Sequence, residues 1–435
     1  MKSLLTLSGK MYKTYFIQTL QMLKQNKFIS IISILGTALA IMMIMTIIVA
    51  DKIKNISLSP ESNRYRTLYI KHVVMDDGNG TMNSWPPKYN FVRDYLYKME
   101  VPEVVSAVSL YWPDYTELSI VGREGVKGNL NSVLRMTDAA YWQVLSFSFI
   151  EGKAFTQEEF DSGIKSAVIS ESTSKKLFKG ESAIGKTIEI DFFPYQVVGV
   201  VKDVSEAFKY AYGDIWIPYT SETNEDDLND SEFFVMLLAK DKKDFSAIIE
   251  ESKDVIRKYE ANNAPWKLFI NGPQNKELDS MQVMGLDQEM VDSRIKIAER
   301  KKVFILLVLL LVPAINLSGF SLSRIRKRMS EIGIRKAFGA KKYEILTQVL
   351  YENMITSLVG GIIGLLFSYL VVLWLKDWLL GISASSFVPL QALVSPSVFI
   401  GVFIVCLLFN LLSAGIPAYR ASRMSIVNSI NQNEE

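Results

Sequence analysis

The chain has 435 residues, of which 49% are hydrophobic, and its formal net charge at pH 7 is only +2. This length exceeds one typical domain, and the near-neutral charge excludes a nucleic-acid binder, which needs a basic face. A single histidine and a single cysteine exclude an intrachain disulfide and a zinc site built from clusters of these residues. We therefore expect neither a nucleic-acid partner nor a bound metal.

Four uncharged apolar segments predict transmembrane helices. The first, 28–50, is long enough at about 1.5 Å per residue to cross a bilayer core of about 30 Å. It is also too long for the apolar part of a cleaved signal peptide, so a retained anchor is favoured. The other three lie near the C-terminus, at 303–320, 354–375 and 398–416. A proline inside the second segment is tolerated where neighbouring helices satisfy the freed carbonyl.

Basic residues predict the orientation of these helices, because short basic segments stay on the cytoplasmic side. Lysines without acidic neighbours occur in 1–27, Lys and Arg outnumber acidic residues in 321–353, and arginines follow the last span in 417–435. Both termini and the middle loop are therefore expected in the cytoplasm. The short loop 376–397 and the long segment 51–302 would then be extracytoplasmic.

The external segment predicts a mixed α+β domain that is large enough for its own core. Short β-branched runs predict strands at 166–170, 186–190 and 195–201. Amphipathic spacing predicts helices at Asn90–Glu100 and Asp244–Asn262. The apolar stripe of the second helix consists of Phe245, Ile248, Ile249, Val255, Ile256 and Tyr259. The expected fold is an α-helical membrane protein with four transmembrane helices and a large mixed α+β extracytoplasmic domain inserted between helices 1 and 2.

The run from Asp287 to Lys302 precedes the second apolar segment and contains no helix-breaking residue. We expect it to join 303–320 in one continuous helix that projects from the membrane. Such a helix is stiff along its length, so it would act as a lever between the external domain and the membrane.

The segment Gly180–Thr187 matches the Walker A pattern GxxxxGK[ST]. A P-loop requires a buried strand before this pattern and a helix after it, so that backbone amides and the helix N-terminus meet the phosphates. Here 171–179 predict a helix and Thr187–Ile190 begin a strand, which is the reverse order. The expected external location also argues against ATP. We interpret the two glycines as turn residues and expect no ATPase site.

The block Arg324–Lys342 reads RIRKRMSEIGIRKAFGAKK. A docking element and a topology signal that contacts anionic lipid headgroups explain its charge equally well. The finer pattern predicts a short helix, because Ser330 can cap it, Glu331 suits its first turn and Gly339 can end it. The apolar side chains then available for contact are Ile332, Ile334 and Phe338.

Several stretches resemble a known family. Residues 330–372 look like the hallmark region of the FtsX-like and MacB-like permeases of ABC transporters; they read SEIGIRKAFGAKKYEILTQVLYENMITSLVGGIIGLLFSYLVV. Residues 417–430, PAYRASRMSIVNSI, are similar to the usual ending of that family. Residues 137–155 and 166–204 resemble the MacB periplasmic core domain, in which a GKTI-type turn before a strand is usual. The resemblance covers nearly the whole chain.

The resemblance implies a permease subunit of the bacterial cytoplasmic membrane that drives export. It would form a homodimer, or a heterodimer with a related permease, and dock on a separate ABC ATPase subunit that uses the ATP. No cofactor is expected to bind this chain directly, whereas membrane lipids and a periplasmic adaptor are compatible partners. The ATPase-coupling residues would be Glu331, Ile332, Gly333, Ile334, Arg335, Lys336, Phe338, Gly339 and Ala340.

Gly360, Gly361 and Gly364 give the third apolar segment a face of small residues. Such a face lets two helix backbones approach closely. Packing within the chain and a contact between two subunits explain it equally well.

Other functions stay open from the sequence. An FtsX-type scaffold would regulate an external partner such as a cell-wall hydrolase, and a lipoprotein-release permease would share the same membrane region. A membrane-anchored sensor would need a signalling domain, which the short inner segments do not supply. His72 and Cys406 cannot complete a Ser/His/Asp or Cys/His set, so no catalytic residue is assigned.

Overall fold

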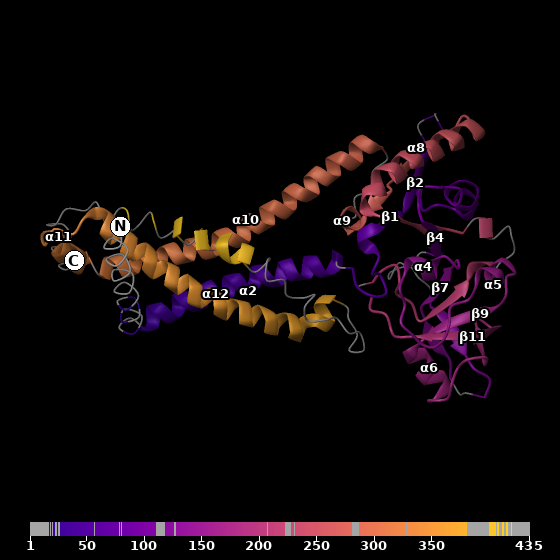
Figure 1. The fold of residues 1–435 in the computed structure, drawn as a ribbon, viewed down its shortest axis with the longest axis horizontal. Helices are drawn as coiled ribbons and strands as arrows, with labels where there is room; N and C mark the ends of the chain where they lie inside the picture. The colour runs from indigo at the N-terminus through magenta and orange to yellow at the C-terminus, as the bar shows by residue number, and fades with distance from the viewer. Residues whose placement is uncertain are drawn as a thin grey trace, which may run out of the picture. The chain divides into compact units, whose positions relative to one another are not determined.

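The computed structural model describes residues 27–380, apart from 56, 78, 80, 110–117, 126–127, 207, 222–227, 230, 281–286 and 328, and also residues 17, 19, 21, 24, 400–405, 407–408, 411–412, 415 and 419. The chain divides into two compact units (Figure 1). The helical unit comprises Met1–Asp51, Arg300–Leu375 and Pro389–Glu435. The mixed unit comprises Lys52–Glu299 and Lys376–Val388.

Helices build the helical unit. They are α2 (Lys27–Asn55), α10 (Gln288–Lys327), α11 (Met329–Ala337) and α12 (Lys342–Leu380). Within the described part of the chain, the stretches Ser30–Ile48 and Lys342–Val371 are long and apolar enough to cross a membrane. Residues 400–405 are also helical. The predicted spans at 303–320 and 398–416 stay predictions, and most of 376–397 lies outside the described residues.

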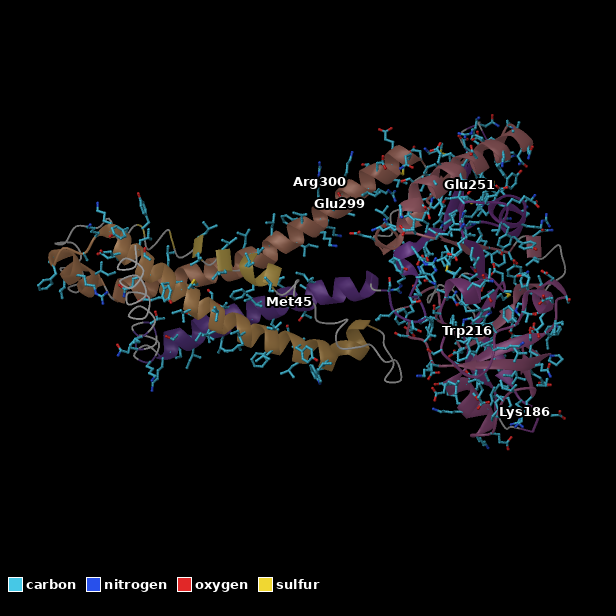
Figure 2. All side chains as sticks on the ribbon, viewed as in Figure 1. Met45, Lys186, Trp216, Glu251, Glu299 and Arg300 are labelled. Carbon is cyan, nitrogen blue, oxygen red and sulfur yellow. The ribbon has the colours of Figure 1, made fainter. Side chains whose placement is uncertain are left out.

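The predicted continuous helix before the second apolar segment is confirmed, because α10 runs for 40 residues without interruption. The Asp287 carboxylate caps its first turn by accepting a 2.7 Å hydrogen bond from the Met290 backbone N–H. Figure 2 labels Glu299 and Arg300, where α10 passes from the mixed unit to the helical unit. One rod of backbone hydrogen bonds therefore belongs to both units.

A large sheet of twelve strands forms the centre of the mixed unit. Its order is β15 (Gln274–Asn275), β1 (Thr67–Ile70), β13 (Phe233–Leu238), β4 (Val104–Ser109), β7 (Leu134–Thr137), β12 (Ile215–Pro218), β9 (Ser166–Ser170), β11 (Phe193–Val201), β10 (Thr187–Ile190), β5 (Ser119–Gly122) and β6 (Leu130–Ser132), with β8 (Phe149–Gly152) also on β11. The β9–β11 and β7–β12 pairs are parallel. A second, antiparallel sheet has the order β14 (Lys267–Asn271), β2 (His72–Asp76) and β3 (Met82–Trp85).

Shorter elements connect these strands. The helices are α3 (Tyr89–Phe91), α4 (Tyr141–Val144), α5 (Gln157–Asp161), α6 (Glu171–Phe178), α8 (Phe245–Asn262) and α9 (Lys276–Ser280). Single turns of 3-10 helix lie at Arg64–Arg66, Tyr219–Ser221 and Lys242–Asp244.

The middle of the large sheet is buried on both faces. Along β9, Val168 belongs to one hydrophobic core while Ala167 and Ile169 belong to another. Along β12, Trp216 lies in the first core and its neighbours in the second. Successive side chains of a strand point to opposite faces, so both faces are covered. This agrees with the short β-branched run that predicts β9.

Most of the secondary structure predicted in this unit is confirmed. Strands β9, β10 and β11 lie at the three predicted positions, and α8 matches the helix predicted at Asp244–Asn262. Its predicted stripe is wrong at Ile249, whose side chain is 37% exposed, because one residue turns the helix by about 100° away from the buried Ile248.

The helix predicted at Asn90–Glu100 is wrong in extent and type. Only α3 is an α-helix, and Val92–Leu96 form a π-helical turn in which the Tyr97 N–H donates to the Val92 carbonyl over 2.9 Å. This wider turn places Val92 and Leu96 fully inside the core. Tertiary packing therefore overrides the regular helical period here.

Candidate functional site

The helix α11 lies within the predicted ATPase-coupling block. It ends at Ala337 and is followed by Gly339, whose φ of +91° favours glycine, and the Ala340 N–H donates to the Arg335 carbonyl over 3.0 Å. This hydrogen bond is the signature of a Schellman ending, so the predicted stop is confirmed. The predicted cap at Ser330 is wrong, because α11 starts at Met329 and Ser330 lies inside it.

The two sides of α11 differ in exposure. Ile332 and Gly333 are buried, whereas Ile334 is exposed and Phe338 is 89% exposed. Residues four apart lie on the same face of a helix, so Ile334 and Phe338 form one apolar surface, called here the docking face. Ala340 is half-buried. The side chains of Glu331 and Lys336 lie outside the described part of the chain.

A hydrogen-bond relay ties α11 to α12. Arg335 Nη1 donates to Gln348 Oε1 over 2.7 Å, and Gln348 Nε2 donates to Glu352 Oε1 over 3.2 Å. Gln348 and Glu352 are both buried. Sequence reasoning singled out Arg335 but missed its partners. Polar residues at a spacing of four within a largely apolar helix were the available signal.

The three glycines of α12 lie where other helices approach closely. A Cβ added at Gly364 would meet the Ala38 carbonyl oxygen of α2 at 2.5 Å, and one at Gly361 would meet the Phe403 ring at 2.6 Å. Gly360 faces α2 in the same way. The structure therefore uses this small-residue face for packing within the chain.

The Walker-like segment has the element order expected from the sequence. Helix α6 precedes it and β10 follows it, while Gly180 and Gly185 adopt φ values of +95° and +78°. Figure 2 shows Lys186 at the rim of the mixed unit, where its ammonium pairs with the Glu181 carboxylate at 2.6 Å. This arrangement is a turn and lacks the strand-loop-helix geometry of a P-loop.

A polar cavity of about 250 Å³ lies beside the N-terminus of α6. The Asp203 carboxylate accepts hydrogen bonds from the Ser172 N–H and hydroxyl, and Asp214 accepts one from the Val133 N–H. Both carboxylates therefore stabilise local backbone. Among the described residues no three His, Cys, Asp or Glu side chains are grouped to hold a metal ion.

Comparison with known families agrees with this arrangement. The MacB-like periplasmic core domain matches residues 30–255, more than half of the chain, and the FtsX-like permease C-terminal region matches 303–426. The second match contains α11, the relay and the glycines of α12.

Curated relatives include permeases of different lengths. The chain is 25% identical to the ABC transporter permease YknZ of Bacillus subtilis (strain 168), covering 73% of this chain and 79% of YknZ. It is 24% identical to the macrolide export ATP-binding/permease protein MacB of Pasteurella multocida (strain Pm70), covering 97% of this chain and 60% of that protein. The pyoverdine export ATP-binding/permease protein PvdT of Pseudomonas aeruginosa is 28% identical over 66% of this chain and 40% of its own length.

Solved structures with some likeness include the extracellular domain of YknZ, with a TM-score of 0.35 and 18% identity over 47% of this chain and 99% of that one. The periplasmic region of MacB from Actinobacillus actinomycetemcomitans gives a TM-score of 0.34 and 17% identity over 49% and 92%. The family assignment rests on the sequence matches. This chain belongs to the ABC transporter permeases that combine a MacB-like periplasmic core domain with an FtsX-like permease C-terminal region.

Proposed function

We propose that this chain is the permease subunit of a MacB-type ABC exporter. A separate ATPase subunit hydrolyses the ATP, and the mixed unit moves outside the membrane in response. The observation that carries the proposal is the docking face, an exposed apolar surface on a helix that is hydrogen-bonded to α12. The relatives named for macrolide and pyoverdine export make export the favoured use of such motion.

The docking face would bind the ATPase subunit. Ile334 and Phe338 are exposed in the single chain, and burying an aromatic side chain of this size contributes about 2 kcal/mol. The Schellman ending fixes the C-terminal backbone of α11, and the Arg335–Gln348 hydrogen bond fixes α11 to α12. A push or pull on this face would therefore move α12 with it.

The continuous helix α10 would carry the motion outward. Its 40 residues span about 60 Å, and α11 starts within two residues of its end. Because no loop interrupts α10, a displacement near Lys327 would be carried along one helix toward Gln288. The energy of ATP hydrolysis would thus perform work on the mixed unit.

The membrane arrangement completes the proposal. Four spans, cytoplasmic termini and an extracytoplasmic mixed unit would place the docking face on the ATP side of the bacterial cytoplasmic membrane. Two permease chains, identical or related, would sit on two ATPase subunits, and a periplasmic adaptor would contact the mixed unit. The lipid bilayer surrounds the apolar helices.

Co-purification from detergent tests the proposal. We expect the wild-type chain to bring down an ABC ATPase subunit that hydrolyses ATP, and Phe338→Ser to lose it. Phe192→Ser is the matched control, since Phe192 is also an aromatic residue with a 78% exposed side chain but lies in the mixed unit. An ATPase retained by Phe338→Ser would contradict the docking role. If no form binds an ATPase but all bind a cell-wall hydrolase, the chain is a regulator of the FtsX type.

A further inference from the structure

The mixed unit contains a buried group of charged and tyrosine side chains that joins its first and last segments. It is called here the root cluster and consists of Glu61, Arg64, Lys71, Tyr210, Lys276 and Asp279. The two carboxylates are almost completely buried, with exposures of 1% for Glu61 and 3% for Asp279. Burial of this much charge is rare unless each ion is paired.

Asp279 is the centre of the root cluster. It accepts a 2.7 Å hydrogen bond from the Tyr210 hydroxyl and pairs with the ammonium groups of Lys71 and Lys276. The Lys276 ammonium also lies 4.8 Å from the centroid of the Tyr210 ring. These partners come from α9, from the residue after β1, and from the connection between β11 and β12. Asp279 therefore holds three separate segments together.

Glu61 extends the root cluster toward α2. Its carboxylate pairs with Arg64 and accepts a 3.1 Å hydrogen bond from the Tyr210 backbone N–H. The Tyr210 ring stacks on Tyr69 of β1, with ring centroids 4.4 Å apart. Tyr210 is thus held by both carboxylates, one through its hydroxyl and one through its backbone.

The pKa of each buried carboxylate lies below its ordinary value. Burial would raise the pKa of Asp279, but Lys276 and Lys71 hold that pKa below its ordinary value. Burial would likewise raise the pKa of Glu61, but Arg64 and Lys276 hold that pKa below its ordinary value. Replacing buried ion pairs with apolar residues is often neutral or stabilising. Stability alone therefore gives no reason for this cluster.

The position of the root cluster gives a reason. Glu61 follows the end of α2 at Asn55 closely, and α9 is the last described element before α10. Backbone pairing between the first and last strands is slight, because β15 meets β1 only at Leu68↔Asn275 and Tyr69↔Gln274. The ionic and ring contacts of the cluster therefore add to these two backbone pairs in tying α9 to the rest of the large sheet.

We propose that the root cluster is the site at which movement of α10 enters the mixed unit, with Asp279 as its positioning residue. This inference rests on the proposed function. α9 precedes α10 along the chain, and a pull that reaches α9 would pass through Asp279 to Lys71 and Tyr210. Lys71 directly follows β1, β1 is hydrogen-bonded to β13, and the side chains of β13 belong to the aromatic core. Without Asp279, only the short β1–β15 pairing would carry the movement from α9 to the large sheet, and the response of the sheet would be weaker.

Hydrogen exchange of the detergent-solubilised full chain tests the local link. Asp279→Asn leaves two ammonium groups without this anion, so we expect amides of 274–280 to exchange about 100-fold faster. Asp138→Asn is the matched control, because Asp138 is equally buried but lies outside the root cluster. Tyr210→Phe removes only the hydroxyl and should give a smaller increase. Unchanged exchange at 274–280 in both root-cluster variants would overturn the proposal.

The complex with its ATPase tests the transmission of motion. In the wild type, ATP should alter hydrogen exchange in the mixed unit. In Asp279→Asn, ATP hydrolysis should continue while that alteration falls at least fivefold, and Asp279→Glu should restore part of it. A full response to ATP in Asp279→Asn would overturn the coupling role alone. A wild-type complex without any response would overturn the proposed function and this role with it.

A disulfide across β1 and β15 separates coupling from folding. Leu68 and Asn275 are directly opposite, and antiparallel partners have Cα atoms about 4.5–5.5 Å apart, which a disulfide accepts. In an Asp279→Asn chain that also carries Cys406→Ser, Leu68→Cys and Asn275→Cys, oxidation should restore the response to ATP. The reduced form of the same chain is the control. Equal responses in both forms would overturn the proposal.

Discussion

The guanidinium of Arg335 on α11 donates a 2.7 Å hydrogen bond to the side-chain oxygen of Gln348 on α12. Gln348 in turn donates to Glu352, one turn further along α12. Because Gln348 and Glu352 are buried, water competes poorly for these hydrogen bonds. The relay therefore makes α11 and the first turns of α12 one mechanical body.

Gln348→Leu removes the acceptor for Arg335 while keeping the bulk of the side chain. A hydrogen bond to a charged group contributes about 1.5–3 kcal/mol, so α11 should detach more readily from α12. We expect the ATPase to bind still but its hydrolysis rate to respond less to the permease. Gln196→Leu, on the exposed side of β11, is the control. An unchanged rate in Gln348→Leu would refute the role of the relay.

Gly364→Ala should destabilise the helical unit. The new Cβ would lie 2.5 Å from the backbone oxygen of Ala38, which cannot move without shifting α2, and overpacking of this kind costs about 1–3 kcal/mol. Gly36→Ala, also in a helix, has nothing within 4 Å of the new Cβ and should keep or raise the stability. Thermal unfolding in detergent compares the two variants. Equal melting temperatures would show that α12 does not pack on α2 in this way.

Lys186→Met should leave nucleotide binding and hydrolysis by the complex unchanged. The ion pair of Lys186 with Glu181 is partly exposed, and surface pairs of this kind contribute about 0–1 kcal/mol. Fluorescent ATP should bind the isolated permease neither before nor after the substitution. Binding by the wild type that disappears in Lys186→Met would restore the P-loop interpretation.

Asp138 should make stability depend on pH. Burial raises the pKa of Asp138 to about 6, although its carboxylate accepts hydrogen bonds from the Tyr97 hydroxyl and the Ala107 N–H. A folded-state pKa above the unfolded value means that the folded form binds the proton more tightly. This contribution, roughly 3 kcal/mol, is fully present below about pH 4 and is lost as the pH rises through 6.

The measurement is the free energy of unfolding at pH 5 and pH 7.5, followed by tryptophan fluorescence, for wild type and Asp138→Asn. Burial, aided by Lys71 and Lys209, lowers the pKa of His72 to about 4. The lowered pKa of His72 makes stability rise with pH, which is opposite to the effect of Asp138. The difference between the two chains removes the His72 contribution. Wild type should lose stability relative to Asp138→Asn as the pH rises. A constant difference would contradict the raised pKa.

Local patterns were sufficient to predict the elements whose environment is uniform. The β9 strand is buried on both faces, and the run from Asp287 to Lys302 that opens α10 has no breaking signal, so local sequence indicated both. Gly339 was predicted correctly because its positive φ is a backbone requirement that few other residues meet. The turn at Val92–Leu96 was not predictable, since its π geometry is set by the core around it.

Contacts between distant residues were beyond the reach of sequence reasoning. Asp279 and Lys71 look like ordinary surface charges in the sequence, yet they meet inside the mixed unit. Arg335 was named for its place in a family motif, whereas its acceptor Gln348 was hidden in an apolar helix. In each case the partner is chosen by tertiary structure, and one sequence carries no record of that choice.

The antiparallel pairing of β1 with β15 places the first and last described strands of the mixed unit side by side. Two ends that lie side by side let a domain be removed or exchanged without stretching the chain on either side. The mixed unit is therefore suited to being grafted as a cassette between related permeases, with the helices that flank it left at their own lengths. Each such graft would have to bring both halves of its own root cluster.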